Sequence, residues 1–188
     1  TGFRLNQLIN GLSIKNLYVT FPEFGSNDPS NIKVVNNLSL DIHTGEIIAL
    51  VGESGSGKTI TGLATLGLIP SPGNVVSGKI IFDGLDLLKL SKNSIYKYRG
   101  NRISMIFQDP TTALNPTLTV GNQISEAYEL HNKSNRRKTR MLAIELLGRV
   151  GAPDSARIYD SYPHQLSGGL RQRVMIAMAI ICEPELLI

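Results

Sequence analysis

The residues from Gly52 to Thr59 have the types and spacing of a loop that binds the phosphate groups of a nucleotide. They follow the pattern G-x-x-x-x-G-K-[ST], in which glycines let backbone N–H groups turn towards an anion. The apolar run 47–51 predicts a buried parallel strand before the loop, and residues 60–68 predict a helix whose positive end faces the phosphates. This strand–loop–helix order favours a phosphate site over a glycine-rich turn with a chance lysine.

Two side chains of the loop have the chemistry for direct contacts with a nucleotide. The ammonium group of Lys58 is expected to reach the β- and γ-phosphates, and the hydroxyl of Thr59 is expected to bind Mg²⁺. Upstream, Phe21 and Phe24 each offer a ring that either stacks on the base or packs in the core, and both interpretations stay open. The expected contact residues are Phe21, Gly52, Ser54, Gly55, Ser56, Gly57, Lys58 and Thr59.

The composition is that of an ordinary globular chain. At 188 residues one domain is expected, and 41% hydrophobic residues suffice for a core. No apolar run approaches the ~20 residues of a membrane-spanning helix, and no secretory signal pattern opens the chain. The single cysteine, Cys182, excludes an internal disulfide and is interpreted as a small core residue, while three scattered histidines show no metal-ligand spacing.

The net charge of +4 is mild, and its densest part is the run Lys133–Arg140. A patch for nucleic acid or anionic lipid is one interpretation of such a run. No aromatic residues interleave it, so a solvated helix start is the favoured interpretation. We therefore expect no nucleic-acid partner.

Hydrophobic periodicity divides the rest of the chain into strands and helices. Strands are predicted at about 13–21, 32–42, 79–82 and 103–107. Helical patterns are predicted at about 92–99 and from 120 to 150, with Gly151 as a C-cap. The expected fold class is α/β, with an antiparallel β subdomain and a helical subdomain of about residues 111–165 inside a single domain of residues 1–188.

The stretch Tyr162–Arg173 leads into a second helix start. Ser167 is a good N-cap, and residues 174–182 are almost wholly apolar, so this helix is expected to be buried on most sides. Pro184 ends it, and Glu185–Ile188 predict the beginning of another buried strand.

Together these motifs resemble the ATP-binding subunits of ATP-binding cassette (ABC) transporters. Four features match in order along essentially the whole chain, and they imply the P-loop NTPase core of that family. They are the phosphate loop Gly52–Thr59, the Q-loop glutamine Gln108, the signature Leu166-Ser167-Gly168-Gly169 and the start of the Walker B strand at Leu186–Ile188. The signature, followed by Arg171-Gln172-Arg173, is far more specific than a phosphate loop alone.

Finer matches resemble the branch that imports oligopeptides and dipeptides, whose close relatives import nickel. They are Phe107–Pro110 continuing into Ala113–Pro116, and Tyr162–Gln165 before the signature. Two positions depart from the pattern. Leu170 stands where glutamine or methionine is usual, and Ile60 stands where threonine is common, which leaves only the backbone N–H of Ile60 to reach the α-phosphate.

The resemblance implies a transport-coupled ATPase with ATP and Mg²⁺ as cofactors. Lys58 and Gln108 are the implied catalytic residues, and Thr59 and Gln108 lie at the implied metal. A second cassette, identical or different, would pack head to tail against the first, so that Leu166–Gly169 serves the nucleotide of the partner. Transmembrane permease subunits are the other implied partners, which places the protein at the cytoplasmic face of the cell membrane.

In this family an aspartate for Mg²⁺, a catalytic glutamate and a switch histidine would follow Ile188. We therefore expect the chain to be part of a longer subunit and to be inactive alone. Import of nickel or another solute, and a nucleotide-binding fragment without hydrolysis, stay as alternatives. A soluble cassette of DNA repair, chromosome structure or translation would carry coiled coils, zinc modules or tandem cassettes, and a kinase or GTPase would not explain Leu166–Gly169.

Overall fold

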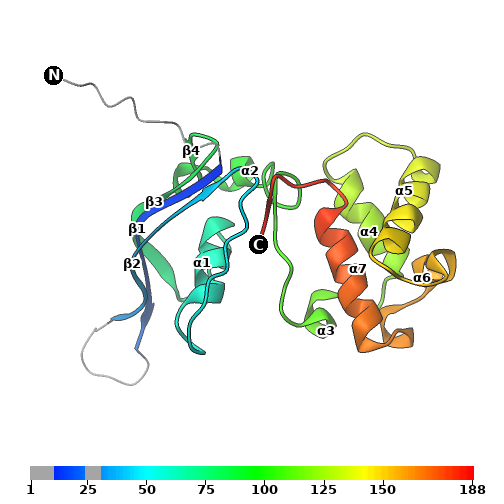
Figure 1. Ribbon diagram of the computed structural model, residues 1–188, viewed down its shortest axis with the longest axis horizontal. Helices are drawn as coiled ribbons and strands as arrows, with labels where there is room; N and C mark the ends of the chain where they lie inside the picture. Colours follow the sequence, from blue (N-terminus) through cyan, green and yellow to red (C-terminus); the bar gives the residue numbers. More distant parts are fainter. Residues whose placement is uncertain (1–10, 24–30) are drawn as a thin grey trace. The chain divides into compact units, whose positions relative to one another are not determined.

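The computed structural model describes residues 11–23 and 31–188, so Phe24 and most of the turn-rich loop after it lie outside the described residues. The chain divides into two compact units, residues 1–95 and 96–188 (Figure 1). The first unit contains an antiparallel sheet and helix α1, and the second contains helices α3 to α7 with a short parallel sheet. Among the described residues no helix is both long and apolar enough to cross a bilayer.

The sheet of the first unit has the strand order β2-β1-β3-β4. Its strands are β1 (Gly11–Pro22), β2 (Asn31–His43), β3 (Asn74–Phe82) and β4 (Leu85–Asp86). The register places Ile14 opposite Leu40 on β2 and opposite Ile80 on β3, so apolar side chains gather on one face. Ile14 and Ile80 are almost completely buried. The predicted antiparallel strands are confirmed, and β3 begins five residues before the predicted start at residue 79.

The remaining elements of the first unit are short. They are α1 (Lys58–Thr65), the 3-10 helix η1 (Leu87–Lys89) and α2 (Lys92–Ile95). Helix α1 ends before the predicted position 68, because Gly67 takes a left-handed backbone with φ of 61°. The helix predicted at 92–99 is confirmed only for its first half.

The prediction of a buried strand at 47–51 is wrong. Residues 47–51 have no regular structure, and Ile47 and Val51 are 97% and 89% exposed. A strand exists only through hydrogen bonds to neighbouring strands, and among the described residues no strand pairs with this run. The run is apolar, but an apolar composition does not show whether another strand is available to pair with it.

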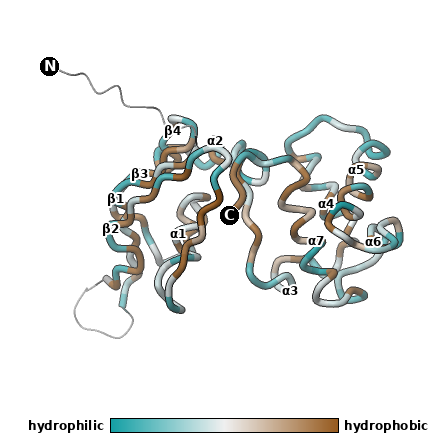
Figure 2. The backbone as a smooth tube through the Cα atoms, in the orientation of Figure 1, coloured by the Kyte–Doolittle hydropathy of each residue, from teal (hydrophilic) through white to brown (hydrophobic). Residues whose placement is uncertain are grey.

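The second unit is built mainly from helices. They are α3 (Pro110–Ala113), α4 (Val120–Glu129), α5 (Arg136–Arg149), α6 (Ser155–Asp160), the 3-10 helix η2 (Pro163–Gln165) and α7 (Gly168–Ile180). Fully buried side chains from four of these helices meet in one core, and they include Ile124, Leu147, Ile158 and Val174. The hydrophobic stretches of α4 and α7 are visible in Figure 2. The predicted burial of the helix after Ser167 is confirmed by this core.

The strands predicted at 103–107 and 185–188 are much shorter than expected. They consist of β5 (Ile103–Ser104) and β6 (Leu186–Leu187), which pair in parallel. Arg102 and Glu185 join the two segments through paired N–H···O bonds of 2.6 and 2.8 Å between the guanidinium and the carboxylate. Leu187 is 47% exposed, so the expected full burial of this strand is not found.

Polar contacts tie α4, α5 and α6 together around the ring of Tyr159. Its hydroxyl lies 3.0 Å from that of Ser125, and the guanidinium of Arg140 lies 4.4 Å from the ring centroid. Arg140 also donates two hydrogen bonds to Asp160, and these hold the pKa of that carboxyl below its ordinary value. The ring occupies the space that a side chain at Gly121 would need, because a Cβ there would lie 2.2 Å from a ring atom.

This contact predicts opposite effects for two helical glycines. Gly121→Ala forces the Tyr159 ring or α4 to move and should lower the free energy of unfolding by about 1–3 kcal/mol. Gly148→Ala places its Cβ at an ordinary distance of 3.4 Å from Ser155 Oγ, so better helix propensity should leave stability unchanged or raise it by up to about 1 kcal/mol. Urea unfolding of both variants measures the difference, and equal effects would contradict the packing described.

Candidate functional site

The phosphate loop is seated against strand β2 by a close backbone approach. Gly57, the residue before α1, has φ of 85°, a left-handed conformation that favours glycine. A Cβ at this position would lie 2.5 Å from the carbonyl oxygen of Val34 on β2. Both the conformation and the contact require glycine, so Gly57 fixes the point where the loop becomes helix.

Lys58 lies at the first position of α1 and reaches back across the loop. Its Nζ donates to the carbonyl oxygens of Gly52 and Glu53, each at 2.7 Å, and to Ser56 Oγ at 3.2 Å. Loop oxygens thus surround the ammonium group and hold it at the loop. A phosphate oxygen that approaches the loop meets a cation already placed there.

The start of α1 presents backbone donors without a side-chain cap. No side chain accepts from its first N–H groups, and the first turn contains no acidic residue. The N–H of Thr61 donates to Gly57 O at 2.8 Å, so the earlier N–H groups of Lys58, Thr59 and Ile60 precede the helical hydrogen-bond pattern. A helix start with open donors and a partial positive charge fits a phosphate group.

A cavity of about 280 Å³ lies beside the loop within the first unit. Gly52, Ser56 and Lys58 line it together with residues of β2, among them Val34, Val35, Asn36 and Leu38. The sequence analysis missed the β2 residues, because nothing in their alternating pattern indicates which loop lies against them. The remaining loop positions Ser54, Gly55 and Thr59 are exposed, and Ile60 is half-buried.

Phe21 lies outside this cavity lining. Its ring packs against Gly73, where a Cβ would come within 2.4 Å of a ring atom. One side of the ring is therefore occupied by the backbone of the same unit, which favours packing over base stacking in this conformation. The stacking role of Phe21 stays a prediction, and Phe24 lies outside the described residues.

Gln108 and its neighbours belong to the second unit. Gln108 is exposed and precedes α3, whose N-cap Asp109 accepts a hydrogen bond from the N–H of Thr111 at 2.8 Å. This hydrogen bond lowers the pKa of Asp109 and commits its carboxylate to capping. A carboxyl group with a lowered pKa is a weaker general base.

The signature forms a second helix start in the second unit. Leu166 is buried in the helical core, and the exposed Ser167 caps α7 by accepting from the N–H of Leu170 at 3.4 Å. A Cβ on Gly168 or Gly169 would meet nothing within 4 Å, so this turn presents bare backbone to solvent. The predicted N-cap is confirmed.

Two arginines after the signature hold the segments around it. Arg171 Nε donates to the carbonyl oxygen of Pro163 at 2.8 Å, and Arg173 Nη1 donates to that of Val150 at 2.6 Å. The first bond fixes the chain just before the signature, and the second satisfies a carbonyl at the end of α5. The sequence analysis noted both arginines only as part of a motif and assigned no contacts to them.

The structure brings the phosphate-loop residues together in one unit and places Gln108 and the signature in the other. Metal binding by Thr59 together with Gln108 therefore stays a prediction. Within residues 11–23 and 31–188, no group of three or more histidine, cysteine or acidic side chains is arranged to hold a metal ion. Of the two predicted ligands, Thr59 fits Mg²⁺ through an exposed hydroxyl beside the phosphate loop.

The chain is similar to known proteins along most of its length. A family model described as ABC transporter matches residues 35–188. A dipeptide transport ATP-binding protein of Bacillus subtilis (strain 168) is 47% identical over 178 residues, which are 94% of this chain and 52% of that protein. One from Escherichia coli (strain K12) is also 47% identical, over 94% of this chain and 53% of its own length. The chain spans about half the length of these curated relatives.

Solved structures give the same picture. The chain superposes on a dimeric ATP-binding cassette, solved in a post-hydrolysis state with ADP and phosphate, with a TM-score of 0.82 at 26% identity. That match covers 94% of this chain and 72% of the other. A subunit of an ABC transporter complex from Clostridium perfringens matches with a TM-score of 0.71 at 25% identity, over 95% of this chain and 64% of the other.

Lys58→Ala tests the phosphate loop. The substitution removes a charge-assisted contact to phosphate, worth about 1.5–3 kcal/mol, so the affinity for ATP should fall about tenfold or more. Lys79→Ala removes the same charge from an exposed position on β3 and should leave the affinity unchanged. Calorimetric titration with ATP measures both variants, and equal affinities for Lys58→Ala and the parent protein would overturn the assignment.

Proposed function

This chain belongs to the ABC transporter family, and from that membership we propose that it is the ATP-binding part of a subunit that couples ATP hydrolysis to peptide import. The observation that carries the nucleotide assignment is the uncapped start of α1, with Lys58 held across the loop in front of it. Backbone N–H groups and a fixed ammonium group are the donors that a polyphosphate needs.

The second helix start suggests why two cassettes act together. Ser167, Gly168 and Gly169 present a hydroxyl and bare backbone at the positive end of α7, a 13-residue helix. We assign this turn to the nucleotide of a partner cassette, so each ATP is bound between the loop of one cassette and the signature of the other. ATP then favours the closed dimer, and loss of the γ-phosphate releases it.

Hydrolysis requires groups that position water and stabilise charge in the transition state. Lys58 is assigned to the β- and γ-phosphates, the Thr59 hydroxyl to Mg²⁺, and Gln108 to the metal and the attacking water. Mg²⁺, when bound, neutralises charge that develops on the phosphate oxygens. Asp109 is not assigned as the base, because one of its carboxylate oxygens accepts the capping hydrogen bond from Thr111.

Peptides are the proposed solute. Support comes from the relatives that are 47% identical and named for dipeptide transport, and from a further relative, 46% identical, named for oligopeptide transport. Nickel or another solute handled by the same branch is the alternative. The proposed partners are a second cassette and transmembrane permease subunits, and the proposed location is the cytoplasmic face of the membrane, without a nucleic-acid partner.

If each ATP is bound between two cassettes, a substitution in the signature should impair dimerisation and turnover without impairing ATP binding to the phosphate loop. Ser167→Arg fills the bare turn before α7 with a bulky cation, so it should leave ATP binding to the dilute monomer within about twofold but abolish ATP-driven dimerisation and turnover. Met141→Arg adds the same charge at a position on α5 that is 65% exposed, and it should retain all three properties. Calorimetry, light scattering and phosphate release measure the three properties. Loss of monomer binding in Ser167→Arg would refute a signature that serves the partner nucleotide.

The segment from Leu114 to Leu130 is proposed to dock the permease. The docking end is its N-terminal end, which follows Gln108 closely in the sequence. A cysteine in place of Thr117, which is exposed within this segment, should cross-link to the permease in membranes, whereas a cysteine in place of Met141 on α5 should not. The native Cys182 is a weak competitor because burial raises the pKa of its thiol. Cross-linking from position 141 alone would place the permease on another face.

A further inference from the structure

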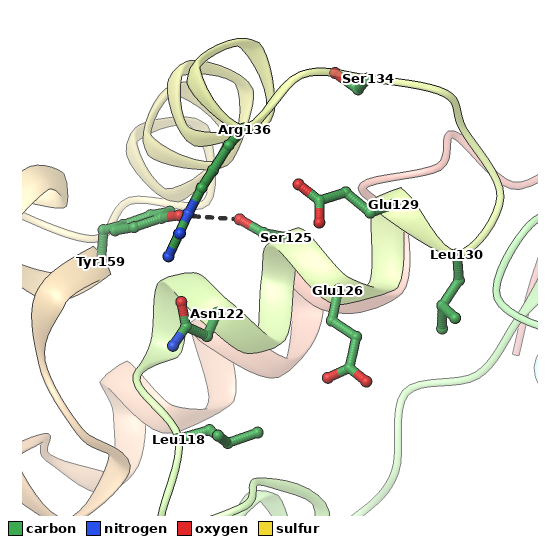
Figure 3. Close-up of a pocket in the computed structure, with 9 residues that line it drawn as sticks. All are labelled: Leu118, Asn122, Ser125, Glu126, Glu129, Leu130, Ser134, Arg136 and Tyr159. Atoms are coloured by element: carbon green, nitrogen blue, oxygen red, sulfur yellow. Dashed lines mark hydrogen bonds between the residues drawn. The ribbon is translucent and has the colours of Figure 1, made fainter.

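A short loop in the second unit, residues 115–118, leads from the end of α3 towards the start of α4. Leu114 before it and Val120 shortly after it are buried in the helical core, whereas residues 115–117 are exposed. Figure 3 shows Leu118 on the chain that leads into α4. The 115–118 loop thus projects from two fixed ends, and it lies at the N-terminal end of the segment that is proposed to dock the permease.

The side chain of Gln123 holds this loop from the first turn of α4. It is only 5% exposed, and its Oε1 accepts a hydrogen bond from the N–H of Asn115 at 2.9 Å. Its Nε2 donates to the carbonyl oxygens of Asn115 at 3.0 Å and of Leu118 at 3.1 Å. One buried amide therefore binds both ends of the loop, and it uses both of its N–H protons there.

The loop also contains a side-chain turn of its own. Asn115 Oδ1 accepts from the backbone N–H of Thr117 at 3.0 Å and from the Thr117 hydroxyl at 2.7 Å. Turns of this kind fix the backbone locally. At the helix start, the Thr119 hydroxyl accepts from the N–H of Asn122 at 3.3 Å. The exposed part of the loop is thus held in one conformation by polar contacts rather than by burial of its own side chains.

Stability alone does not explain a buried glutamine at this position. An exposed loop can exchange its hydrogen bonds for bonds to water, so each bond to Gln123 adds little to the free energy of unfolding. Burial of the amide meanwhile costs desolvation and rotamer freedom, and an apolar side chain would avoid the first cost. What the amide provides is a single loop conformation, and a surface that is ordered beforehand binds a partner with a smaller loss of entropy.

We propose that Gln123 is a positioning residue for permease docking. It holds the 115–118 loop in the conformation in which the permease contacts Pro116 and Thr117, while Gln123 itself is buried beneath the loop. The loop has no charged side chain, and its exposed part offers a proline ring and the oxygen of a threonine hydroxyl. It therefore suits an uncharged permease surface with a hydrogen-bond donor. This inference rests on the proposed function, which assigns the permease to this segment.

The test adds increasing concentrations of the whole subunit to membranes that contain the permease, and it measures ATP-driven transport. Gln123→Leu keeps a buried side chain but removes the three hydrogen bonds to the loop. The loop must then become ordered during docking, so the subunit concentration for half-maximal transport should rise at least about tenfold. The maximal rate should stay at the parental value, because the docked complex is the same. An unchanged half-maximal concentration, with or without a fall in the maximal rate, would overturn the proposal.

A second variant and a control separate positioning from stability. Gln123→Glu keeps the acceptor for Asn115, but its carboxylate cannot donate to the two carbonyl oxygens, so it should also raise the half-maximal concentration. Ile158→Val shortens a fully buried side chain of the same core without touching the loop, and it should lower the free energy of unfolding while docking as the parent does. Urea unfolding shows that each variant is folded in the assay. Equal half-maximal concentrations for all three variants would overturn the positioning role.

The same assay distinguishes this inference from the proposed function. A parent subunit that binds no permease would refute the docking assignment, and the role of Gln123 with it. A parent subunit that drives import, together with Gln123 variants that dock equally well, would refute the positioning role alone. Import of nickel or another solute, with the expected effect of Gln123→Leu, would refute peptide import and retain the positioning role.

Discussion

The close approach of Gly57 to the carbonyl oxygen of Val34 is the constraint on which the phosphate loop depends. It fixes the position of the start of α1 next to strand β2, and any side chain at Gly57 would push the helix start and the strand apart. Once that point is fixed, Lys58 can donate hydrogen bonds to the carbonyl oxygens of Gly52 and Glu53. The first N–H groups of α1 come before the intrahelical hydrogen bonds begin, so they have no partner within the helix. The antiparallel sheet is thus the platform that positions the proposed anion site.

In the second unit, the helix start at Ser167 is held in place by side-chain contacts. Its helix start at Ser167 is capped by its own side chain, and it is anchored from behind by Leu166 in the helical core. Arg171 and Arg173 bind carbonyl oxygens of the chain before the signature and after α5. The bare backbone of the signature is therefore exposed but held in place, which a turn that meets a partner nucleotide requires.

Several helices of this unit have charged side chains near their ends, and these ends differ in whether the charge is neutralised by a partner. Arg140 and Asp160 neutralise each other between α5 and α6, and the pKa of Asp160 is lowered by that contact. At the end of α4 and the start of α5, by contrast, the side chains carry the sign of the helix end itself.

The sequence alone determined the phosphate loop, the cap at Ser167, the antiparallel strands and the buried helix after the signature, because each follows from local patterns of glycine, caps and alternation. It could not determine whether residues 47–51 form a strand, since pairing depends on distant neighbours. It also could not show that β2 lines the cavity beside Lys58, or that the ring of Tyr159 packs against Gly121. Those facts depend on which segments meet in space, and only the tertiary structure decides that.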